Sequence, residues 1–233
     1  MHDDHKHQHI AVAKKVMGEN DRLAAINRRR FGELGLFVIN VMSSPGSGKT
    51  MLLQKTLTAL KDSLRIGVVV GDICTTNDAE RLSLAGEIPA VQICTDAFGG
   101  DCHLTAPVVW DAASGLDLKN LDLLIVENLG NLVCPAEFDI GEDRRVVVLS
   151  VTEGEDKPSK YPLMFQVCDL AILGKIDLLP HLDYDLELAR SHIRGVHPHM
   201  PIIELSARTG EGVEQWTDWL TREIAKKKKA AGR

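Results

Sequence analysis

A three-layer α/β fold with a mostly parallel sheet is the class that this sequence predicts, on three observations. Several short runs of β-branched and aliphatic residues have no polar interruption, as in strands that are covered on both faces. Stretches with a helical pattern of apolar residues separate these runs along the chain. The chain has 233 residues, which suits one large α/β domain. Buried strands that alternate with helices predict one parallel sheet between two layers of helices.

Composition excludes several classes of protein. Hydrophobic residues make up 44% of the chain, which excludes global disorder, and no apolar run reaches the roughly 20 residues of a membrane span. The net charge of -6 gives no basic surface for nucleic acid. Five cysteines without a signal-peptide pattern favour reduced thiols, available for metal or redox chemistry, over a disulfide framework. We therefore expect a soluble, cytoplasmic protein that binds neither nucleic acid nor a membrane.

The first nine residues include four histidines, which are His2, His5, His7 and His9. A histidine-rich tract binds borderline divalent metals through imidazole, although a purification tag has a similar composition. The acidic and amide residues between the histidines favour a native, mobile arm that scavenges metal ions. The expected organisation is this arm over 1–9, one domain over 10–225 that begins with a packing helix, and a basic tail over 226–233 that forms a frayed, solvated helix end.

The stretch from Val38 to Thr50 predicts a strand, a phosphate-binding loop and the start of a helix. In such a loop, backbone N–H groups cradle phosphate oxygens, a lysine reaches the β- and γ-phosphates, and the next hydroxyl binds Mg²⁺. Lys49 and Thr50 fill the last two roles. Ser43 stands where the strict pattern has glycine, and the alternative is an ordinary turn rich in serine and glycine. The predicted fold is that of the P-loop NTPases, with the nucleotide held by Pro45, Gly46, Ser47, Gly48, Lys49, Thr50 and Met51.

Two acidic residues at the ends of predicted strands are candidates for the magnesium ion. Asp72 follows a β-branched run, and Glu127 follows an apolar run in which it replaces the more common aspartate of a Walker B strand. Because ligands of open α/β sheets bind at the carboxyl ends of the strands, we expect both carboxylates beside the phosphate loop, with Asp72 also positioning the attacking water. Gly130 would offer a backbone N–H to the γ-phosphate. The alternative for Asp72 is a helix N-cap, a role that Asn77 or Asp78 would serve equally well, and Asp78 is a second candidate for the water.

Two further segments predict that the bound base is guanine. Lys175 and Asp177 follow a predicted strand in the pattern [Asn/Thr]-Lys-x-Asp, in which the aspartate accepts hydrogen bonds from guanine and the lysine stem covers the base. The segment Ser206-Ala207-Arg208 follows another strand and resembles the second guanine loop, where a backbone N–H meets the guanine oxygen. Gly174 replaces the asparagine of the first pattern, so the side-chain hydrogen bond that normally buttresses this region is missing. The alternative for Lys175 and Asp177 is a solvated pair that caps a helix.

An imidazole and two thiols lie in segments that are expected to contact the phosphates. Cys102 and His103 precede a predicted helix, and Cys134 follows Gly130 closely. One metal ion bound to all three would connect both segments to the state of the nucleotide. Thiolate and imidazole ligands suit Zn²⁺ or Ni²⁺, and the missing fourth ligand favours a second subunit or an exchangeable ion. Most adjacent Cys-His pairs bind nothing, however, and small buried hydrophobes are an equal alternative for Cys74, Cys94 and Cys168.

These segments together resemble the HypB-type hydrogenase nickel-incorporation GTPases, which are relatives of the urease accessory GTPase. The resemblance begins near Asn20 and rests on residues 40–50, 71–72, 77–81, 102–104 and, above all, the segment 127–135, Glu-Asn-Leu-Gly-Asn-Leu-Val-Cys-Pro. It accounts for Ser43, because the family commonly has Ser-Ser-Pro-Gly at this point. The resemblance implies a GTP-dependent homodimer that binds Ni²⁺ or Zn²⁺ at its interface through Cys102, His103 and Cys134. It also implies that nickel passes to a hydrogenase large-subunit precursor with a HypA-type partner.

The expected mechanism is slow hydrolysis of GTP with Mg²⁺, in which Asp72 positions water, Lys49 neutralises charge, and hydrolysis resets a metal-delivery switch. Three alternatives stay open. A urease-type nickel GTPase would place cysteine, proline and histidine together, whereas Cys102-His103 and Cys134-Pro135 are separate here. A small-molecule kinase that uses ATP would leave the Cys-His-Cys set unexplained. A nickel store would make the histidine arm the working part of the protein.

Overall fold

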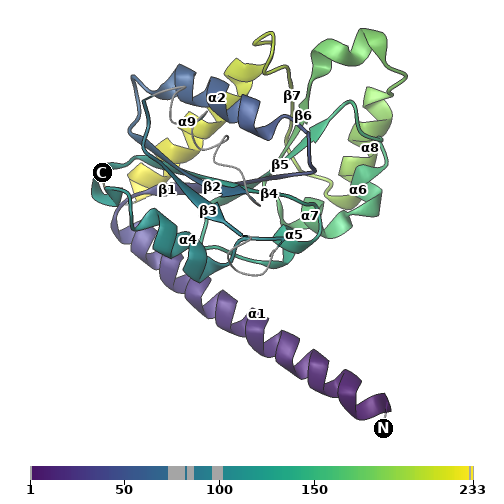
Figure 1. The fold of residues 1–233 in the computed structure, drawn as a ribbon. Helices are drawn as coiled ribbons and strands as arrows, with labels where there is room; N and C mark the ends of the chain where they lie inside the picture. Colours follow the sequence, from purple (N-terminus) through teal and green to yellow (C-terminus); the bar gives the residue numbers. More distant parts are fainter. Residues whose placement is uncertain (1, 73–81, 83–86, 96–101, 231, 233) are drawn as a thin grey trace.

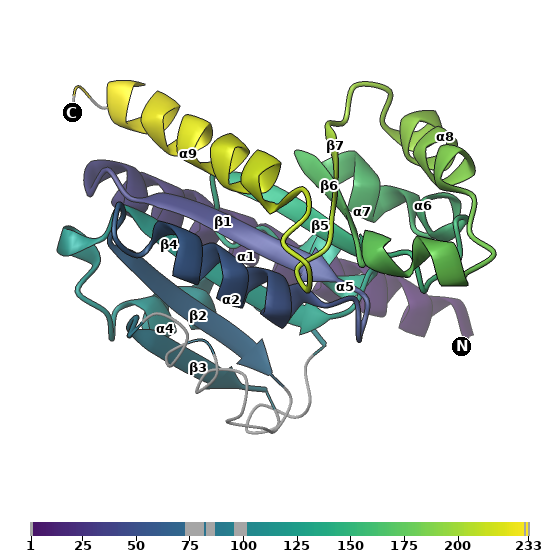
Figure 2. The same cartoon turned by 90° about the horizontal axis from the view of Figure 1, so that it is seen from above.

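A seven-stranded sheet forms the centre of the protein, and each of its strand pairs is parallel. The computed structural model describes residues 2–72, 82, 87–95, 102–230 and 232, with side chains from residue 16 onward. Helices cover both faces of the sheet, as Figures 1 and 2 show from two directions. The predicted three-layer α/β fold is confirmed.

Aliphatic residues dominate the strands, because a strand that is covered on both faces must bury nearly all of its side chains. The strands are β1 (Phe37–Ser43), β2 (Ile66–Asp72), β3 (Ala90–Cys94), β4 (Leu123–Gly130), β5 (Arg144–Ser150), β6 (Leu170–Gly174) and β7 (Ile202–Leu205). Their order across the sheet is β3-β2-β4-β1-β5-β6-β7. The central pair, β1 and β4, therefore carries the phosphate loop on one strand and the Glu127 segment on its neighbour.

β4 continues further than the sequence pattern predicts. The apolar run ends at Val126, but Glu127, Asn128 and Leu129 are also buried within the strand. Glu127 is in register with Val41 of β1, and the register then shifts so that Gly130 is opposite Ser43. Polar residues extend the strand because distant residues bind their side chains. Asn128 donates to Asn40 of β1, and Glu127 accepts from Thr50 of α2, partners that a search for apolar residues does not detect.

Two groups of helices complete the layers. α2 (Lys49–Leu60) and α9 (Val213–Ala230) cover one face, where Leu53, Leu57 and Trp216 are buried against the strands. The other face carries α1 (His2–Glu33), α4 (Ala106–Ala113), α5 (Cys134–Glu137), α7 (Pro162–Val167) and α8 (Leu186–Val196). Shorter helical segments are η2 (Leu118–Asn120), α6 (Lys157–Lys160) and η3 (Ile176–His181). The sheet is thus enclosed except at its ends, where the loops gather.

α1 reaches into the predicted arm. The backbone is helical from His2 onward, and in Figure 1 the N-terminal half of α1 extends away from the body of the protein. The C-terminal half is held by a buried stripe that consists of Asn20, Ala24, Asn27 and Phe31. The role of 2–9 in metal capture and the division of the chain into arm, domain and tail stay predictions.

Lys227 and Lys228 near the end of α9 are ion-paired with residues of the sheet, which differs from the frayed, solvated end that the sequence suggested. Lys227 Nζ lies 2.6 Å from Asp143 Oδ1, and Lys228 Nζ lies 2.8 Å from Asp122 Oδ1. The Lys227 side chain is only 16% exposed. The two acidic residues immediately precede β5 and β4, so the lysines attach α9 to the N-terminal edge of the sheet.

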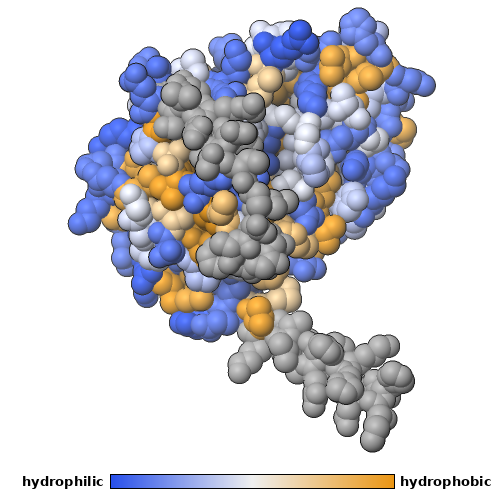
Figure 3. Space-filling view, viewed as in Figure 1, coloured by the Kyte–Doolittle hydropathy of each residue, from blue (hydrophilic) through white to orange (hydrophobic). Residues whose placement is uncertain are grey.

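No helix in the described part of the chain is both long enough and apolar enough to cross a bilayer. Figure 3 shows hydrophilic and apolar residues mixed on one face, with apolar surface also beside the point where α1 leaves the body. The exposed large apolar residues of α1 are Val16 and Met17, among the residues whose side chains are described.

Asp122 should contribute a pH-dependent part of the stability. The Arg65 guanidinium and the Lys228 ammonium, through hydrogen bonds, hold the pKa of this carboxyl well below its ordinary value of 3.8. A carboxyl with a depressed pKa stabilises the fold above its unfolded pKa, and the contribution is lost as the pH falls through the folded pKa. We expect Asp122→Asn to lower the free energy of unfolding by about 1–3 kcal/mol near neutral pH.

Urea unfolding at about pH 7 and about pH 3 measures this effect, and the difference between the two proteins should shrink at the lower pH. Asp62→Asn, at an exposed position, is the matched control and should change little at either pH. If Asp122→Asn lowers the free energy of unfolding by the same amount at both pH values, the ion-pair explanation is contradicted.

Candidate nucleotide and metal site

The loop between β1 and α2 has the backbone shape of a phosphate loop. Gly46 and Gly48 have φ angles of 72° and 95°, values that glycine adopts without steric cost. Ser43 is not among the residues with positive φ, so a side chain fits where the strict motif has glycine. Its hydroxyl donates to the carbonyl of Ser44 at 2.8 Å. The departure from the motif therefore leaves the shape of the loop intact.

The loop lines a cavity of about 550 Å³ at the C-terminal ends of the central strands. Asp72 at the end of β2 contributes to its wall, as do Glu127 and Gly130 of β4. A Cβ atom on Gly130 would lie only 3.1 Å from Cα of Pro45, so β4 and the loop are in close contact at this position. Both predicted carboxylates thus reach the cavity, whereas Asn77 and Asp78 lie outside the described residues.

Glu127 joins the two principal residues of the loop. Thr50 Oγ1 donates to Glu127 Oε1 at 2.7 Å, and Lys49 Nζ lies 3.5 Å from the same oxygen. The Glu127 side chain is 3% exposed, and a buried carboxylate requires partners of this kind. The oxygens of Thr50 and Glu127 therefore meet where the sequence predicts Mg²⁺. They suit this ion, because Mg²⁺ prefers hard oxygen ligands.

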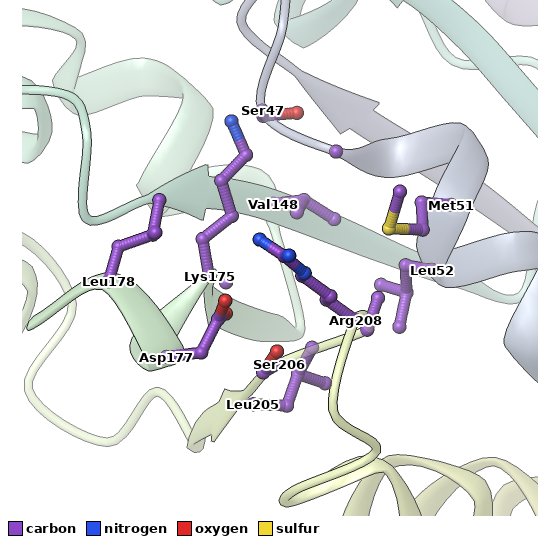
Figure 4. Close-up of a pocket in the computed structure, with 13 residues that line it drawn as sticks. Ser47, Met51, Leu52, Val148, Lys175, Asp177, Leu178, Leu205, Ser206 and Arg208 are labelled. Carbon is purple, nitrogen blue, oxygen red and sulfur yellow. The ribbon is translucent and has the colours of Figure 1, made fainter.

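A second cavity, of about 200 Å³, opens beside the first. The two cavities share wall residues, namely Ser47, Gly48, Met51 and Lys175. Figure 4 shows side chains from the start of α2, from the segment after β6 and from the segment after β7 around this space. The predicted guanine-reading residues all line it, and these are Lys175, Asp177, Ser206, Ala207 and Arg208.

Lys175 is bound to the phosphate loop itself. Its Nζ donates to the carbonyl of Gly46 at 2.7 Å, and its stem passes over Gly48. The φ angle of Lys175 is 61°, which is uncommon for a residue with a side chain. A Cβ on Gly174 would lie 3.3 Å from the carbonyl oxygen of Leu149, so the strand is tightly packed there. Lys175 therefore joins the segment after β6 directly to the phosphate loop.

Cys102, His103 and Cys134 come together in space. Their ligand atoms all lie within 4.8 Å of one another, and Cys102 Sγ is 3.9 Å from His103 Nδ1. Cys102 is exposed, while His103 and Cys134 are partly buried. Metal bonds of about 2.0–2.3 Å to nitrogen and sulfur would need only a small contraction of the group. The donor set suits Zn²⁺ or Ni²⁺ and is unsuited to Mg²⁺.

Sequence reasoning did not identify two residues that support these sites. Asn131 Nδ2 donates to the carbonyl of Cys102 at 3.4 Å, which ties together the two segments that hold the thiols. Glu153 accepts hydrogen bonds from the hydroxyl of Ser44 and, at 3.0 Å, from the backbone N–H of Ser150, so it fixes the phosphate loop to the end of β5. Neither role has a local signal, because Asn131 acts on Cys102 and Glu153 acts on Ser44, which are both far away in the chain.

The remaining candidates have different surroundings. Cys168 is buried and packs against Met164, with 3.8 Å between the two sulfur atoms, and burial raises the pKa of its thiol. It is the small hydrophobe that the sequence suggested, whereas Cys94 is exposed at the end of β3. Cys74 lies outside the described residues, as do the side chains of His2, His5, His7 and His9.

Comparison with known proteins gives consistent matches. Residues 37–204 match the family described as "CobW/HypB/UreG, nucleotide-binding domain". The chain is 50% identical over 214 residues to the hydrogenase maturation factor HypB of Azotobacter vinelandii, covering 92% of this chain and 69% of that protein. The crystal structure of hydrogenase maturation factor HypB from Archaeoglobus fulgidus is similar with a TM-score of 0.82 and 38% identity, covering 89% of this chain and 99% of the other.

A second solved structure, HypB from Helicobacter pylori in complex with nickel, has a TM-score of 0.83 and 37% identity, covering 89% of this chain and 96% of the other. The family match includes the phosphate loop, Glu127 and the Cys-His-Cys group. These similarities confirm the resemblance that the sequence motifs indicated. The chain belongs to the HypB group of the CobW/HypB/UreG family of nucleotide-binding domains.

Proposed function

We propose that this protein hydrolyses GTP and uses the nucleotide state to control nickel delivery to a hydrogenase precursor. The observation that carries the proposal is the contact between β4 and the phosphate loop. Gly130 packs against Pro45, and the chain leads from Gly130 through Asn131 to Cys134. A change in the phosphates that moves Gly130 would therefore move a metal ligand. The name of the relatives, hydrogenase maturation factor, supports a hydrogenase precursor as the recipient of the nickel.

GTP is the proposed nucleotide because the carboxylate of Asp177 lines the cavity beside the phosphate loop and is a suitable acceptor for the N–H groups of guanine. Lys49 neutralises charge on the phosphates, and Asp72 positions the attacking water. Thr50, Asp72 and Glu127 would hold Mg²⁺, which would supply electrostatic stabilisation of the charge that develops on the phosphates. The reaction class is hydrolysis of GTP to GDP and phosphate.

The three ligands Cys102, His103 and Cys134 hold Ni²⁺, or Zn²⁺ in its place, in this proposal. A tetrahedral ion takes four ligands, so a second copy of the chain would complete the site, and metal and nucleotide would both affect dimerisation. The nickel in the Helicobacter pylori structure supports the choice of metal. A HypA-type nickel chaperone and a hydrogenase large-subunit precursor in the cytoplasm are the proposed partners, and the histidine arm would scavenge nickel.

Lys49→Ala tests the catalytic assignment. We expect kcat for GTP hydrolysis to fall by at least about 100-fold, because the cation that meets the phosphoryl charge is removed. Nickel binding to the nucleotide-free protein should stay unchanged. Lys55→Ala, at an exposed position of the same helix, is the control that should keep full activity. An equal loss of turnover and metal binding in Lys49→Ala would indicate misfolding instead.

Asp177→Asn tests the base. We expect the preference for GDP over ADP to fall by about 10- to 100-fold, because a hydrogen bond to a charged group is lost. Competition of each nucleotide against a fluorescent analogue measures the preference. Asp183→Asn, at an exposed position nearby, is the matched control. An unchanged preference in Asp177→Asn would place the base in a different cavity.

Nickel titration with GDP and with a non-hydrolysable GTP analogue tests the switch. The protein should lack residues 2–9 so that the histidine arm does not contribute, and thiolate-to-metal absorption should report binding. We expect the affinity or the dimer mass to depend on the nucleotide, with Cys134→Ala removing this dependence and the control Cys94→Ala retaining it. Identical nickel binding in both states, or absence of a thiolate band, would reject the switch and make the arm the main metal-handling element.

A further inference from the structure

Phe138 lies against the imidazole ring of His103. The two ring centroids are 3.7 Å apart and the ring planes are inclined by 27°, which is a stacked arrangement. Phe138 follows α5 directly, so the same short segment carries Cys134 and the ring that contacts the histidine. A histidine side chain has several rotamers, and an aromatic ring packed on one face of the imidazole reduces their number.

Asn20 of α1 connects the segment that follows Phe138 to the segment that follows His103. Its Nδ2 donates to the carbonyl of Asp139 at 2.8 Å, and its Oδ1 accepts from the backbone N–H of Ala106 at 2.9 Å. Asn20 is 5% exposed. The nitrogen and the oxygen of this one buried amide are therefore each hydrogen-bonded to one of the two segments that flank the metal group.

Asn27 repeats this connection further along the same face of α1. Its Nδ2 donates to the carbonyl of Ala106 at 2.7 Å and to the carbonyl of Ile140 at 3.1 Å. A Cβ on Gly141 would lie 2.5 Å from Cβ of Asn27, which leaves no space between α1 and this segment. Because buried amide hydrogen bonds are costly to break, the two asparagines hold the segments at a set separation.

The other end of the segment after Phe138 is anchored in the sheet. Glu142 is buried and accepts hydrogen bonds from the backbone N–H of Ile140 at 2.9 Å and from Arg145 Nε at 2.5 Å. Glu142 also accepts a hydrogen bond from Asn40 Nδ2 at 3.3 Å. Asn40 Oδ1 in turn accepts from Asn128 Nδ2 at 3.1 Å, and Asn128 is the neighbour of Glu127 in β4. The segment that carries Phe138 is thus fixed between α1 and the strands of the nucleotide site.

We propose that Phe138 is a positioning residue for the metal ligand His103, and that Asn20 and Asn27 of α1 hold its ring in place. Stacking restricts the imidazole to one plane, which keeps a ring nitrogen near both thiols. Phe138 also lines an apolar cavity with Leu23 and Pro107, so α1 borders the ring as well as its backbone. This inference rests on the proposed function, because it concerns metal binding by the Cys-His-Cys group.

The test compares Phe138→Leu, which keeps an apolar side chain without a flat ring, with Phe138→Tyr, which keeps the ring. In the metal-free protein, NMR signals of the His103 ring protons should show the upfield shift of a stacked ring, and only Phe138→Leu should lose it. Nickel affinity, measured by competition with a chelator in the protein lacking residues 2–9, should fall by about tenfold or more in Phe138→Leu and recover in Phe138→Tyr. The thiolate-to-nickel band should change in the same way.

Phe31→Leu is the control for loss of stability, because Phe31 is a buried aromatic residue of α1 that contacts Trp110 instead of the metal group. It should lower stability and leave nickel affinity unchanged. Asn20→Ala should lower nickel affinity in the same direction as Phe138→Leu, and a loss of stability alone would remove the asparagine from the proposal.

The failure of this inference and that of the proposed function are distinguishable. Unchanged nickel affinity in Phe138→Leu, in a protein whose unsubstituted form binds nickel through thiolates, would overturn the positioning role alone. Failure of the unsubstituted protein to bind nickel through thiolates would overturn the proposed function and, with it, any role of Phe138 in metal binding.

Discussion

The buried carboxylate of Glu127 is the group on which the arrangement of the site depends. It sits at the centre of the sheet, at the end of β4, and a carboxylate in such a place is stable only with close hydrogen-bonding and charged partners. Lys49 and Thr50 supply them. These contacts hold the start of α2 and the end of the phosphate loop against β4.

The same strand end also determines where the metal ligands lie. Asn128 is tied to Asn40 of β1, and Gly130 touches Pro45 of the loop. The chain then passes directly to Cys134, which meets Cys102 and His103. One short segment is thus in contact with the phosphate loop at one end and with the metal group at the other. This continuity gives the proposed coupling a mechanical basis.

α1 contributes more than the packing role that its apolar pattern predicts. Its buried stripe includes two asparagines as well as apolar residues, and their amides bind backbone groups on both sides of the metal group. A hydrophobic pattern does not detect amide side chains, yet in the structure these two amides attach α1 to its neighbours. The N-terminal half of the helix extends away from the body (Figure 1), whereas the buried asparagines that attach the helix lie in its C-terminal half.

The sequence alone predicted the strands, the phosphate loop and the segments proposed to read guanine, because each rests on residue types at short spacing that local geometry requires. It also named Cys102, His103 and Cys134 as one set, although only the fold brings Cys134 to the other two. The tertiary structure alone decided the strand order, the extension of β4 through Glu127, the bond from Lys175 to Gly46 and the stack of Phe138 on His103. It also decided that the lysines of α9 pair with acids at the start of two strands. These contacts join residues far apart in the chain, and only packing of the complete sheet brings them within hydrogen-bonding distance.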